Sequence, residues 1–477
     1  MAVWYDVVKS SLGIFGMSKP NILLLMTDQQ RWDALGCYQD WLQTPNLDLI
    51  VDQGIRFTNC VTNSPVCIPA RLSMATGLYP HNTGVWNNVK NQMDCHIPTW
   101  MQAIRSAGYR TSLFGKTHLH PNQGDLRERE DLMSVYGLDD VNEIGGPRAS
   151  TRVLSHMTAE WEAKGIWRDY QDDYRDRFDA KPHVVRPSVL GLDDYADVYV
   201  GQQAKKYLEN YQRSEPWFCW VSFGGPHEPW DTPEPYASLY DMEQMPAPIP
   251  RPDDDRNRPQ GYLDQHMKQL NPQFEPDDIA KMRANYAGNV TLIDHQIGEV
   301  MQVIKDRGEF DNTIIAFVSD HGEMNGDYNL IYKSNFLNGA TRVPLLFRTP
   351  ETAKNEIGGQ ICTSPVEWFD VGPTLVELAG GEINYQQFAK SLCDVLERPM
   401  ETHRDYAISE LNGEIMLLSR EWKIALNTSG EVYLLFSVQE DPDETENLAG
   451  LIEYRDIENQ LRHCILNHLV QSQFQKK

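Results

Sequence analysis

The stretch ANYAGNVTLIDHQIGEVMQVIKDRGEFDNTIIAFVSDHGE, residues 284–323, contains a helix pattern, a strand pattern and a polar strand end in succession. Apolar residues recur on one helical face over residues 284–307, and Gly308 then ends the pattern. Residues 313–318 form a short β-branched and apolar run, which is typical of a buried strand. The polar residues 319–323 follow at once. This order predicts one helix–strand unit of an α/β fold.

Four more runs resemble this strand in length and composition. They lie at residues 21–26, 109–114, 217–223 and 343–347. Helical patterns separate them, and strands that alternate with helices are typical of a mostly parallel sheet with helices on both faces. The sequence therefore predicts a large α/β domain, which we expect over residues 19–380.

The pattern changes after Gly380 and Gly381. Three short apolar runs at residues 415–418, 422–426 and 432–436 lie close together between turn residues, which predicts an antiparallel sheet. A helical pattern over about residues 451–469 follows. We therefore expect a smaller C-terminal α+β subdomain over residues 381–477.

Composition and charge exclude some classes of partner. The 477 residues are 41% hydrophobic and 23% charged, as in an ordinary soluble protein, and no apolar run has transmembrane length. The formal net charge of −25 disfavours nucleic acids and anionic membranes as partners. Asp6 and Lys9 interrupt the mildly apolar N-terminus, so we expect no signal peptide and a cytoplasmic location by default. The eight cysteines form no C-x-x-C pair, which favours reduced thiols over a disulfide framework.

Polar side chains follow four of the five predicted strands of the α/β domain. These strand ends are Thr27-Asp28-Gln29, Gly115-Lys116-Thr117-His118, Gly225-Pro226-His227 and Ser319-Asp320-His321-Gly322-Glu323. In an open parallel sheet, the carboxyl ends of the strands meet at one edge, and ligands bind there. One such residue would usually be a turn or cap residue, but four coinciding ends are hard to explain in that way.

These residue types suit the hydrolysis of an ester that carries a multi-oxygen anion. The oxygen donors for Ca²⁺ or Mg²⁺ are Asp28, Gln29 and Asp320, with His321 as a nitrogen ligand or a hydrogen-bonding partner. The cations available to the anion are Arg71, Lys116 and Lys333. The proton carriers are His118 and His227. On these residues alone, a metal-assisted esterase and a purely structural role both stay open.

Cys67 opens a predicted helix directly after a turn. Pro69 fits the first helical turn, and Arg71 follows it in the same helix. A group at a helix start meets unpaired N–H groups and the positive end of the helix dipole, which favours an anion. A small buried cysteine beside a proline would give the same local sequence. The position of Cys67 after the first strand-end aspartate favours a functional role.

The sequence resembles the formylglycine-dependent sulfatases of the alkaline phosphatase superfamily, over roughly residues 20–450. The first family signature, C-x-P-x-R, is matched by Cys67-Ile68-Pro69-Ala70-Arg71 and continues through residues 72–77. The second is matched by residues 108–111 and 115–119. Further matches are residues 225–227, 319–323, Lys333 with residues 341–344, and the closing segment 441–448. The resemblance implies an alkaline phosphatase-like sheet sandwiched by helices.

The resemblance also implies a mechanism. A separate maturation enzyme would oxidise Cys67 to formylglycine, whose hydrate would attack the sulfur of a sulfate ester. The implied Ca²⁺ ligands are Asp28, Gln29, Cys67 in its modified form, Asp320 and His321. The implied catalytic residues are Arg71 to orient the nucleophile, Lys116 and Lys333 to hold sulfate oxygens, His118 to turn over the hydrate, and His227 to protonate the leaving alcohol. Mg²⁺ and Mn²⁺ stay open, because Gln29 stands where many relatives carry a second aspartate.

Two other functions stay open at this point. A phosphonate monoester or phosphodiester hydrolase of the same superfamily can share this nucleophile and metal site, although Lys116 and His118 favour sulfate. A binding protein on an inactive scaffold would require Cys67 to stay unmodified. Among substrates, we expect a sulfated carbohydrate ahead of a simple aryl or alkyl sulfate. The segment 148–194 and the aromatic residues Trp86, Trp161, Trp167 and Trp230 are candidates to frame the substrate mouth.

Overall fold

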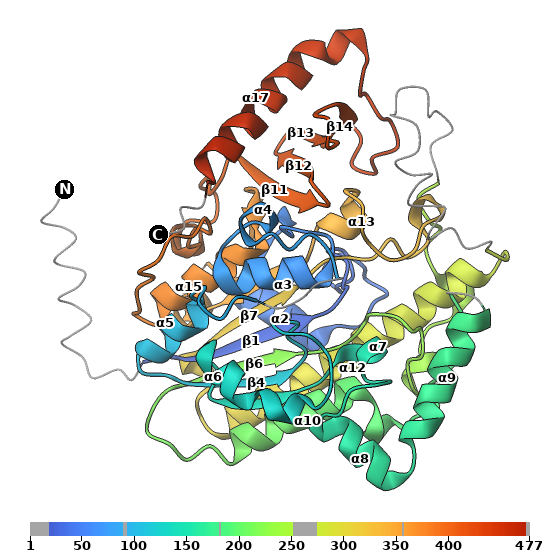
Figure 1. Ribbon diagram of the computed structural model, residues 1–477, viewed down its shortest axis with the longest axis vertical. Helices are drawn as coiled ribbons and strands as arrows, with labels where there is room; N and C mark the ends of the chain where they lie inside the picture. The colour runs from blue at the N-terminus through green and yellow to red at the C-terminus, as the bar shows by residue number, and fades with distance from the viewer. Residues whose placement is uncertain (1–18, 89–92, 181–182, 251–273, 355–356, 474–477) are drawn as a thin grey trace, which may run out of the picture.

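An eight-stranded sheet forms the centre of the protein in the computed structural model, which describes residues 19–88, 93–180, 183–250, 274–354 and 357–473 (Figure 1). The strand order is β5-β4-β6-β1-β7-β8-β2-β9. The strands are β1 Asn21–Thr27, β2 Ile55–Phe57, β4 Arg110–Gly115, β5 Asp140–Glu143, β6 Trp217–Ser222, β7 Thr313–Ser319, β8 Leu345–Arg348 and β9 Gln360–Cys362. The N-terminal segment for which no signal peptide was expected, residues 1–18, lies outside the described residues.

The sheet is mostly parallel, as predicted. Only β8 runs antiparallel to its neighbours β7 and β2 within this sheet. The predicted strand at residues 343–347 corresponds to β8 Leu345–Arg348, the one predicted strand whose end supplied no candidate site residue. Because β8 is reversed, its beginning rather than its end lies at the edge where the other strands finish. The segment that leads into β8 contains Lys333, so this residue also reaches that edge.

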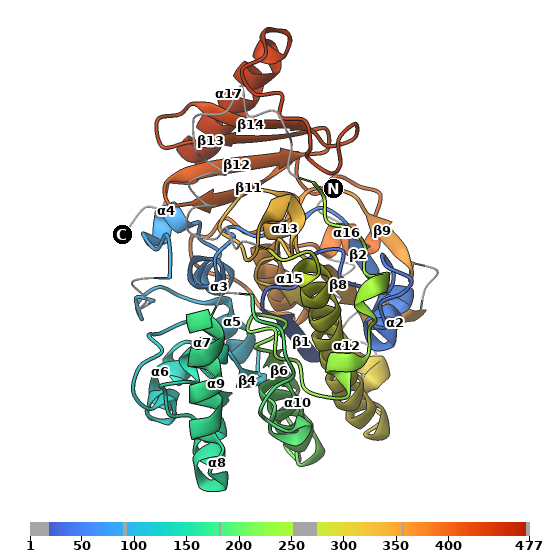
Figure 2. The same cartoon turned by 90° about the vertical axis from the view of Figure 1, so that its right-hand side faces the viewer.

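Two helical layers cover the sheet. All seven residues of β1 are buried, and alternate side chains point to opposite faces. Ile22, Leu24 and Met26 pack in the core shared with α3, α5 and α15, whereas Leu23 and Leu25 pack in the core shared with α10 and α12 (Figure 2). The covering helices are α3 Cys67–Thr76, α5 Trp100–Ser106, α15 Val371–Leu378, α10 Ala196–Glu209 and α12 Asp278–Asp306. Burial on both faces explains why the strand sequences are apolar throughout.

Shorter elements complete the fold. The other helices are α2 Pro45–Gln53, α4 Pro80–Thr83, α6 Glu130–Val135, α7 Gly146–Ala149, α8 His156–Lys164, α9 Trp167–Ala180, α13 Asn338–Thr341, α14 Pro350–Lys354, α16 Cys393–Glu397 and α17 Arg455–Gln471. A two-stranded sheet pairs β3 Cys60–Val61 with β10 Val366–Glu367. Among the described helices, none has the length and apolar character of a membrane span. All eight cysteines lie in the described ranges and carry free thiols.

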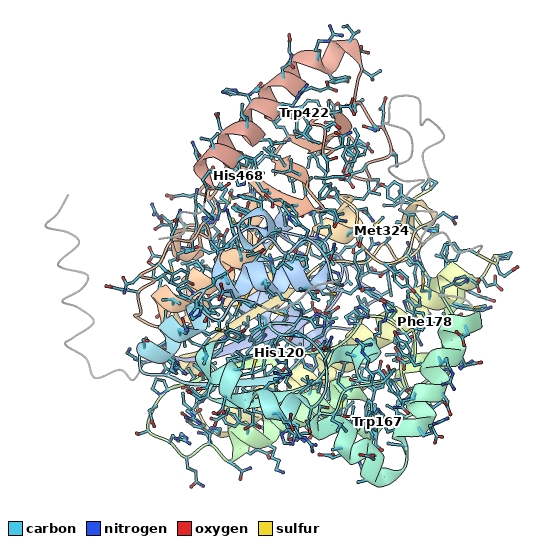
Figure 3. All side chains as sticks on the ribbon, viewed as in Figure 1. His120, Trp167, Phe178, Met324, Trp422 and His468 are labelled. Atoms are coloured by element: carbon cyan, nitrogen blue, oxygen red, sulfur yellow. The ribbon has the colours of Figure 1, made fainter. Side chains whose placement is uncertain are left out.

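The C-terminal part forms a four-stranded antiparallel sheet with α17 packed on it. Its strands are β11 Tyr406–Leu411, β12 Glu414–Ser419, β13 Trp422–Leu426 and β14 Val432–Ser437. Figure 3 shows Trp422 and His468 in this region, where Trp422 packs on Tyr454 near the start of α17. The sequence pattern predicts the last three strands but misses β11. That strand carries two buried polar residues, Ser409 and Glu410, which hide its apolar character.

The strand register aligns the ends that carry polar residues. Met26 of β1 pairs with Ser222 of β6, and Gly115 of β4 pairs with the same Ser222. On the other side of β1, Thr27 pairs with Ser319 of β7. The residues that follow these pairs, including Asp28, Lys116 and Asp320, therefore emerge side by side.

Replacing Leu24 with alanine tests the central role of β1. Leu24 is fully buried, so Leu24→Ala should lower the free energy of unfolding by about 3 kcal/mol through lost burial and the remaining cavity. Leu466→Ala is the matched control, because this leucine is 57% exposed on α17, and its effect should stay within about 0.5 kcal/mol. Urea unfolding monitored by tryptophan fluorescence measures both. Equal effects of the two substitutions would contradict the assignment of β1 to the core.

Candidate active site

Cys67 is the first residue of α3, as the sequence predicts. Val66 before it is extended, with φ −151° and ψ 133°, and its carbonyl accepts the Ala70 N–H at 3.1 Å. Pro69 lies in the first turn, where its missing N–H costs no helical hydrogen bond. The thiol is only 2% exposed, at the positive end of the helix dipole.

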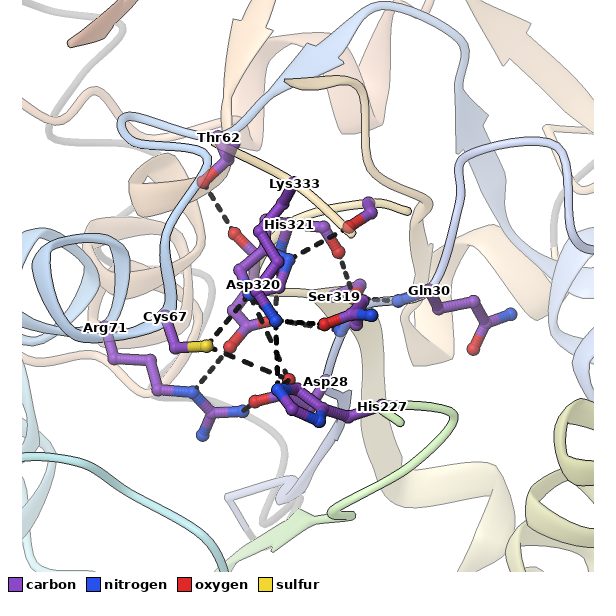
Figure 4. A network of polar contacts seen from close by, with 12 residues as sticks. Asp28, Gln30, Thr62, Cys67, Arg71, His227, Ser319, Asp320, His321 and Lys333 are labelled. Carbon is purple, nitrogen blue, oxygen red and sulfur yellow. Dashed lines mark hydrogen bonds and ion pairs between the residues drawn. The ribbon is translucent and has the colours of Figure 1, made fainter. Parts of the chain in front are cut away.

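Four side chains from three parts of the chain meet around this thiol. The potential ligand atoms of Asp28, Cys67, Asp320 and His321 all lie within 4.8 Å of one another (Figure 4). Cys67 Sγ is 3.0 Å from His321 Nε2 and 4.0 Å from Asp28 Oδ1. His321 Nε2 is 3.6 Å from Asp320 Oδ1. The strand ends that the sequence singled out thus converge on the predicted nucleophile.

This donor set fits a divalent cation. Asp28 and Asp320 are completely buried and supply carboxylate oxygens, the ligands that hard cations prefer. His321 Nδ1 lies 3.0 Å from the carbonyl of Gly322, so the neutral ring that binds a cation keeps its proton on Nδ1 and turns the lone pair of Nε2 toward the cluster. Among the protein groups alone, burial opposes protonation, but the charges of Asp320 and Cys67 raise the pKa of His321 to about 9. Burial and the negative charge of Asp28 raise the pKa of Asp320. Two buried carboxylates so close together call for positive charge between them.

Arg71 supplies part of this positive charge through ion pairs with both aspartates. Its Nε donates to Asp320 Oδ2 at 2.7 Å, and its Nη2 donates to Asp28 Oδ2 at 3.0 Å. Its Nη1 donates to the carbonyl of Lys116 at 2.6 Å and to Ser222 Oγ at 3.1 Å. The fully buried guanidinium therefore fixes both aspartates relative to the ends of β4 and β6. Its expected role toward the nucleophile stays a prediction.

Gln29 lies beside the cluster with a fixed amide orientation. Its Nε2 donates to Glu228 Oε2 at 2.9 Å and also to Glu323, so its Oε1 faces the ammonium of Lys333. The backbone of Gln29 has a φ of 69°, a left-handed conformation that is costly for a residue with a side chain. A hydrogen bond from its N–H to Asp320 Oδ1, 3.1 Å long, helps to hold it there.

Two lysines and a histidine form the rim of the cluster. Lys116 Nζ donates to Asp28 Oδ2 at 2.6 Å. Lys333 Nζ lies 2.9 Å from His227 Nε2, which in turn is 3.9 Å from Asp28 Oδ1. His227 Nδ1 is 2.7 Å from the carbonyl of Glu228, so Nε2 is the nitrogen that can accept the Lys333 proton. These three residues all lie on the side of the cluster that borders the cavity.

The surrounding charges change how the buried groups ionise. Burial and Asp28 oppose ionisation of Cys67, but the positive charges of Lys333, His321 and Lys116 hold the pKa of this thiol well below its usual range. Burial alone would raise the pKa of Asp28, yet Lys116 and its other cationic neighbours hold it well below the ordinary value. Removal from water and the charge of Lys116 lower the pKa of His118 to about 4. The site therefore stabilises negative charge at Cys67.

A cavity of about 1360 Å³ opens above Cys67. Its walls include Lys116, His118, His227 and Lys333, so four more of the predicted residues border the thiol. The structure thus brings together all ten predicted site residues, from Asp28 to Lys333.

The expected aromatic frame of this cavity needs correction. Trp161 and Trp230 are 2% and 3% exposed, because each packs in a hydrophobic core cluster, where Trp161 also donates to the carbonyl of Asp194 and Trp230 stacks on Tyr332. The aromatic residues that line the cavity are instead Tyr174, Phe178 and Tyr332. Tyr174 and Phe178 belong to the segment 148–194 that the sequence proposed for the mouth. Residue type alone does not distinguish these three cavity-lining aromatic residues from the buried tryptophans.

Two carboxylates beside Gln29 had no predicted role. Glu323 belongs to the strand-end run after β7 and is completely buried, and burial together with the charge of Glu228 raises its pKa. Glu228 directly follows His227 and borders the cavity. The sequence could have indicated both carboxylates, since Glu228 directly follows His227 and Glu323 lies two residues after His321.

Known proteins support the fold and the family. The family profile named Sulfatase matches residues 20–381. An arylsulfatase of Clostridium perfringens is 29% identical over 464 residues, covering 94% of each chain. The structure of a phosphonate monoester hydrolase of Agrobacterium radiobacter covers 95% of this chain and 96% of its own, with 23% identity and a TM-score of 0.75. A structure solved in complex with its substrate D-glucosamine-2-N,6-O-disulfate covers 95% of this chain and 98% of its own, with 20% identity and a TM-score of 0.74.

These likenesses agree with the mixed, mostly parallel sheet and the separate antiparallel sheet of an alkaline phosphatase-like fold. The match to the family covers most of the chain and includes the Cys67 helix and every strand end of the site. The chain belongs to the sulfatase family of sulfuric ester hydrolases.

Proposed function

We propose that this protein hydrolyses sulfate esters of carbohydrates, with a nucleophile made from Cys67 and with Ca²⁺ as its metal. The observation that carries this proposal is the position of the Cys67 thiol. It lies at a helix start, 3.0 Å from His321 Nε2, at the base of a cavity lined by Lys116 and Lys333. A hydrolase of anionic esters needs a nucleophile, a metal site and cations around one point.

The proposed cofactors fit the residues present. We assign the cation to Asp28, Gln29, Asp320 and His321, together with the modified residue 67. When bound, the cation supplies Lewis-acid stabilisation of negative charge at the reacting oxygens. Formylglycine at position 67 would supply a hydrated aldehyde, with one hydroxyl for attack on sulfur and a second for the later release of sulfate. A maturation enzyme that forms formylglycine is therefore the proposed partner.

The remaining residues handle the charge and the protons of the substrate. Lys116 and Lys333 both lower the pKa of the Cys67 thiol, which supports their proposed role of holding sulfate oxygens next to residue 67. His227 borders the cavity, and once its Nε2 carries a proton it can donate that proton to the leaving alcohol. His118 borders the same thiol and can accept a proton from the hydrate. Arg71 keeps the two aspartates and the start of α3 in register.

The size and lining of the cavity favour a carbohydrate over a simple aryl or alkyl sulfate. A volume of about 1360 Å³ exceeds what one small ester fills. Tyr174, Phe178 and Tyr332 offer aromatic surface for a sugar ring, beside polar groups such as Asn122 and Gln123. One structural neighbour binds a disulfated glucosamine, in agreement with this substrate class.

Hydrolysis of phosphonate monoesters is the second candidate. Structural neighbours with that activity and the amide of Gln29 in place of a carboxylate favour it. Lys116 and His118 favour sulfate.

Direct kinetic comparison separates these two reactions. We expect kcat/KM for 4-nitrophenyl sulfate to exceed that for 4-nitrophenyl phenylphosphonate by about tenfold or more, because Lys116 and His118 match the second sulfatase signature. Both substrates release the same chromophore, so one assay measures both. A higher kcat/KM for the phosphonate would overturn the sulfatase proposal.

Mass spectrometry tests the nucleophile. After expression with a formylglycine-generating enzyme, the peptide containing Cys67 should be lighter by about 18 Da, the difference between cysteine and formylglycine. Cys67→Ala should abolish sulfatase activity, whereas Cys219→Ala, at a buried cysteine outside the site, should keep it if the protein folds. An active preparation with an unmodified thiol would refute the proposed nucleophile.

Calcium binding tests the metal ligands. Asp320→Asn should weaken Ca²⁺ binding by about 100-fold or more, since it removes a buried carboxylate from the cluster. Asp311→Asn is the control, because this aspartate is 92% exposed on the side chain and outside the cluster. Isothermal titration calorimetry on metal-stripped protein measures both, with circular dichroism to verify folding. Unchanged affinity in folded Asp320→Asn protein would exclude this residue as a ligand.

A further inference from the structure

The cavity above Cys67 contains two arginines that the proposed hydrolysis does not use. Arg148 and Arg152 line the cavity together with Lys116 and Lys333. Both arginines are exposed to solvent. Within the described ranges, neither guanidinium forms an ion pair with a carboxylate, although most arginines of this acidic chain do. Their charge is therefore available to a ligand.

The charge of the cavity lining is opposite to that of the whole protein. The chain carries a formal net charge of −25, yet among the described residues the lining has four lysines and arginines and a single carboxylate, Glu228. Glu228 already accepts from Gln29 Nε2 at 2.9 Å and lies 3.9 Å from Lys333 Nζ. The proposed sulfate site uses Lys116 and Lys333. Two positive charges remain beyond what a single sulfate ester requires.

The backbone that carries the two arginines is held firmly by α9. Tyr170 Oη donates to the carbonyl of Pro147 at 2.9 Å, and Trp167 Nε1 donates to the carbonyl of Ser150 at 2.8 Å. Gln171 Nε2 donates to the carbonyl of Thr151 at 2.9 Å. The three accepting carbonyls flank Arg148 and directly precede Arg152 in sequence. The two guanidiniums therefore project from a fixed support, which lowers the entropy cost of binding a ligand there.

The same support touches the proposed sulfate site. A Cβ atom on Gly146, two residues before Arg148, would lie 3.0 Å from Cδ of Lys116. The short helix α7 thus starts against the Lys116 side chain and continues to Arg148. Lys116 and the two arginines therefore border the same cavity, where a ligand with two anionic groups meets both sets of cations.

Aromatic side chains lie beside the arginines. Burial and the charge of Glu228 raise the pKa of Tyr174, while Arg148 and Arg152 act in the opposite direction, which indicates that both guanidiniums lie near this phenol. Tyr174 and Phe178 stack with ring centroids 4.7 Å apart. An aromatic surface with adjacent cations suits a sugar ring that carries an acidic substituent.

We propose that Arg148 and Arg152 bind a second anionic group of the substrate, a carboxylate or a further sulfate, while Lys116 and Lys333 hold the sulfate that is cleaved. This assignment rests on the proposed sulfatase function and narrows its substrate class to sugars with at least two acidic groups. The two arginines are specificity-determining residues, and they take no part in the chemical step.

Matched disaccharides test this assignment. Three substrates would carry the same sulfate ester beside a neutral sugar, a uronate or a second sulfate. The wild-type protein should show a kcat/KM about tenfold higher for at least one of the dianionic substrates than for the neutral one. The Arg148→Gln, Arg152→Gln double variant should lose this preference and keep its activity on the neutral substrate. The better of the two dianions identifies the second group as carboxylate or sulfate.

Arg168→Gln is the control, because this arginine lies on α9 with its side chain 76% exposed and outside the cavity, and it should keep the wild-type preference. Equal kcat/KM values for all three substrates in the wild type, or an unchanged preference in the double variant, would overturn the assignment while leaving sulfatase activity intact. If no sulfate ester is hydrolysed, the proposed function fails instead. The same comparison with phosphonate monoesters that carry or lack a carboxylate then tests the two arginines independently.

Discussion

A buried arginine between two aspartates is the interaction on which the site depends. Asp28 and Asp320 follow neighbouring strands, and two unit charges 4 Å apart would repel by about 4 kcal/mol at an effective dielectric constant near 20. Arg71 donates to both and also ties them to the backbone after β4 and to Ser222. Because its guanidinium is planar and always charged, it holds this geometry in a way that a lysine could not. The carboxylates that suit a cation are therefore in position through the helix that begins with Cys67.

The C-terminal sheet supports the same helix from the other side. Val66, directly before Cys67, packs in a core shared with Met416, Leu418 and Tyr433 of that sheet. The carbonyl of Asn63 accepts the Glu410 N–H at 2.8 Å. The turn that presents Cys67 is thus fixed by residues of β11, β12 and β14 as well as by the central sheet. A small sheet far along the chain contributes to the nucleophile without supplying a residue to the cavity.

Sequence alone predicts this site well where one rule applies, namely that parallel strands end at a common edge. Asp28, Lys116 and Asp320 follow β1, β4 and β7 directly, so a correct list of strands already brings them together. Tyr174 and Arg148 could not be found in this way, because their positions depend on how α9 packs on α7. The prediction that Trp161 and Trp230 frame the mouth was wrong for a related reason. The burial of Trp161 depends on tertiary contacts that its neighbours in sequence do not encode.

The same limits explain the errors in the fold. β11 was missed because Ser409 and Glu410 are polar yet buried, and only their distant partners make burial favourable: Glu410 lies 2.6 Å from His81 Nδ1. α12 begins at Asp278, six residues before the apolar pattern that predicted it, and Arg283 in its first turns donates to the carbonyls of Asn325 and Pro246 in neighbouring loops.

The central position of β1 has a consequence for folding. Its two neighbours, β6 and β7, come from residues about 200 and 290 positions later, and the Gln29 N–H bonds to Asp320 across 291 residues. Pairings so distant in sequence are slow to form, because the intervening chain must lose its freedom first. Cys67 follows the end of β1 at Thr27 in the N-terminal part of the chain, so the ribosome synthesises it long before β7. The Cys67 thiol is therefore synthesised well before Asp320, His321 and Lys333, three of the charged groups that surround it in the folded protein.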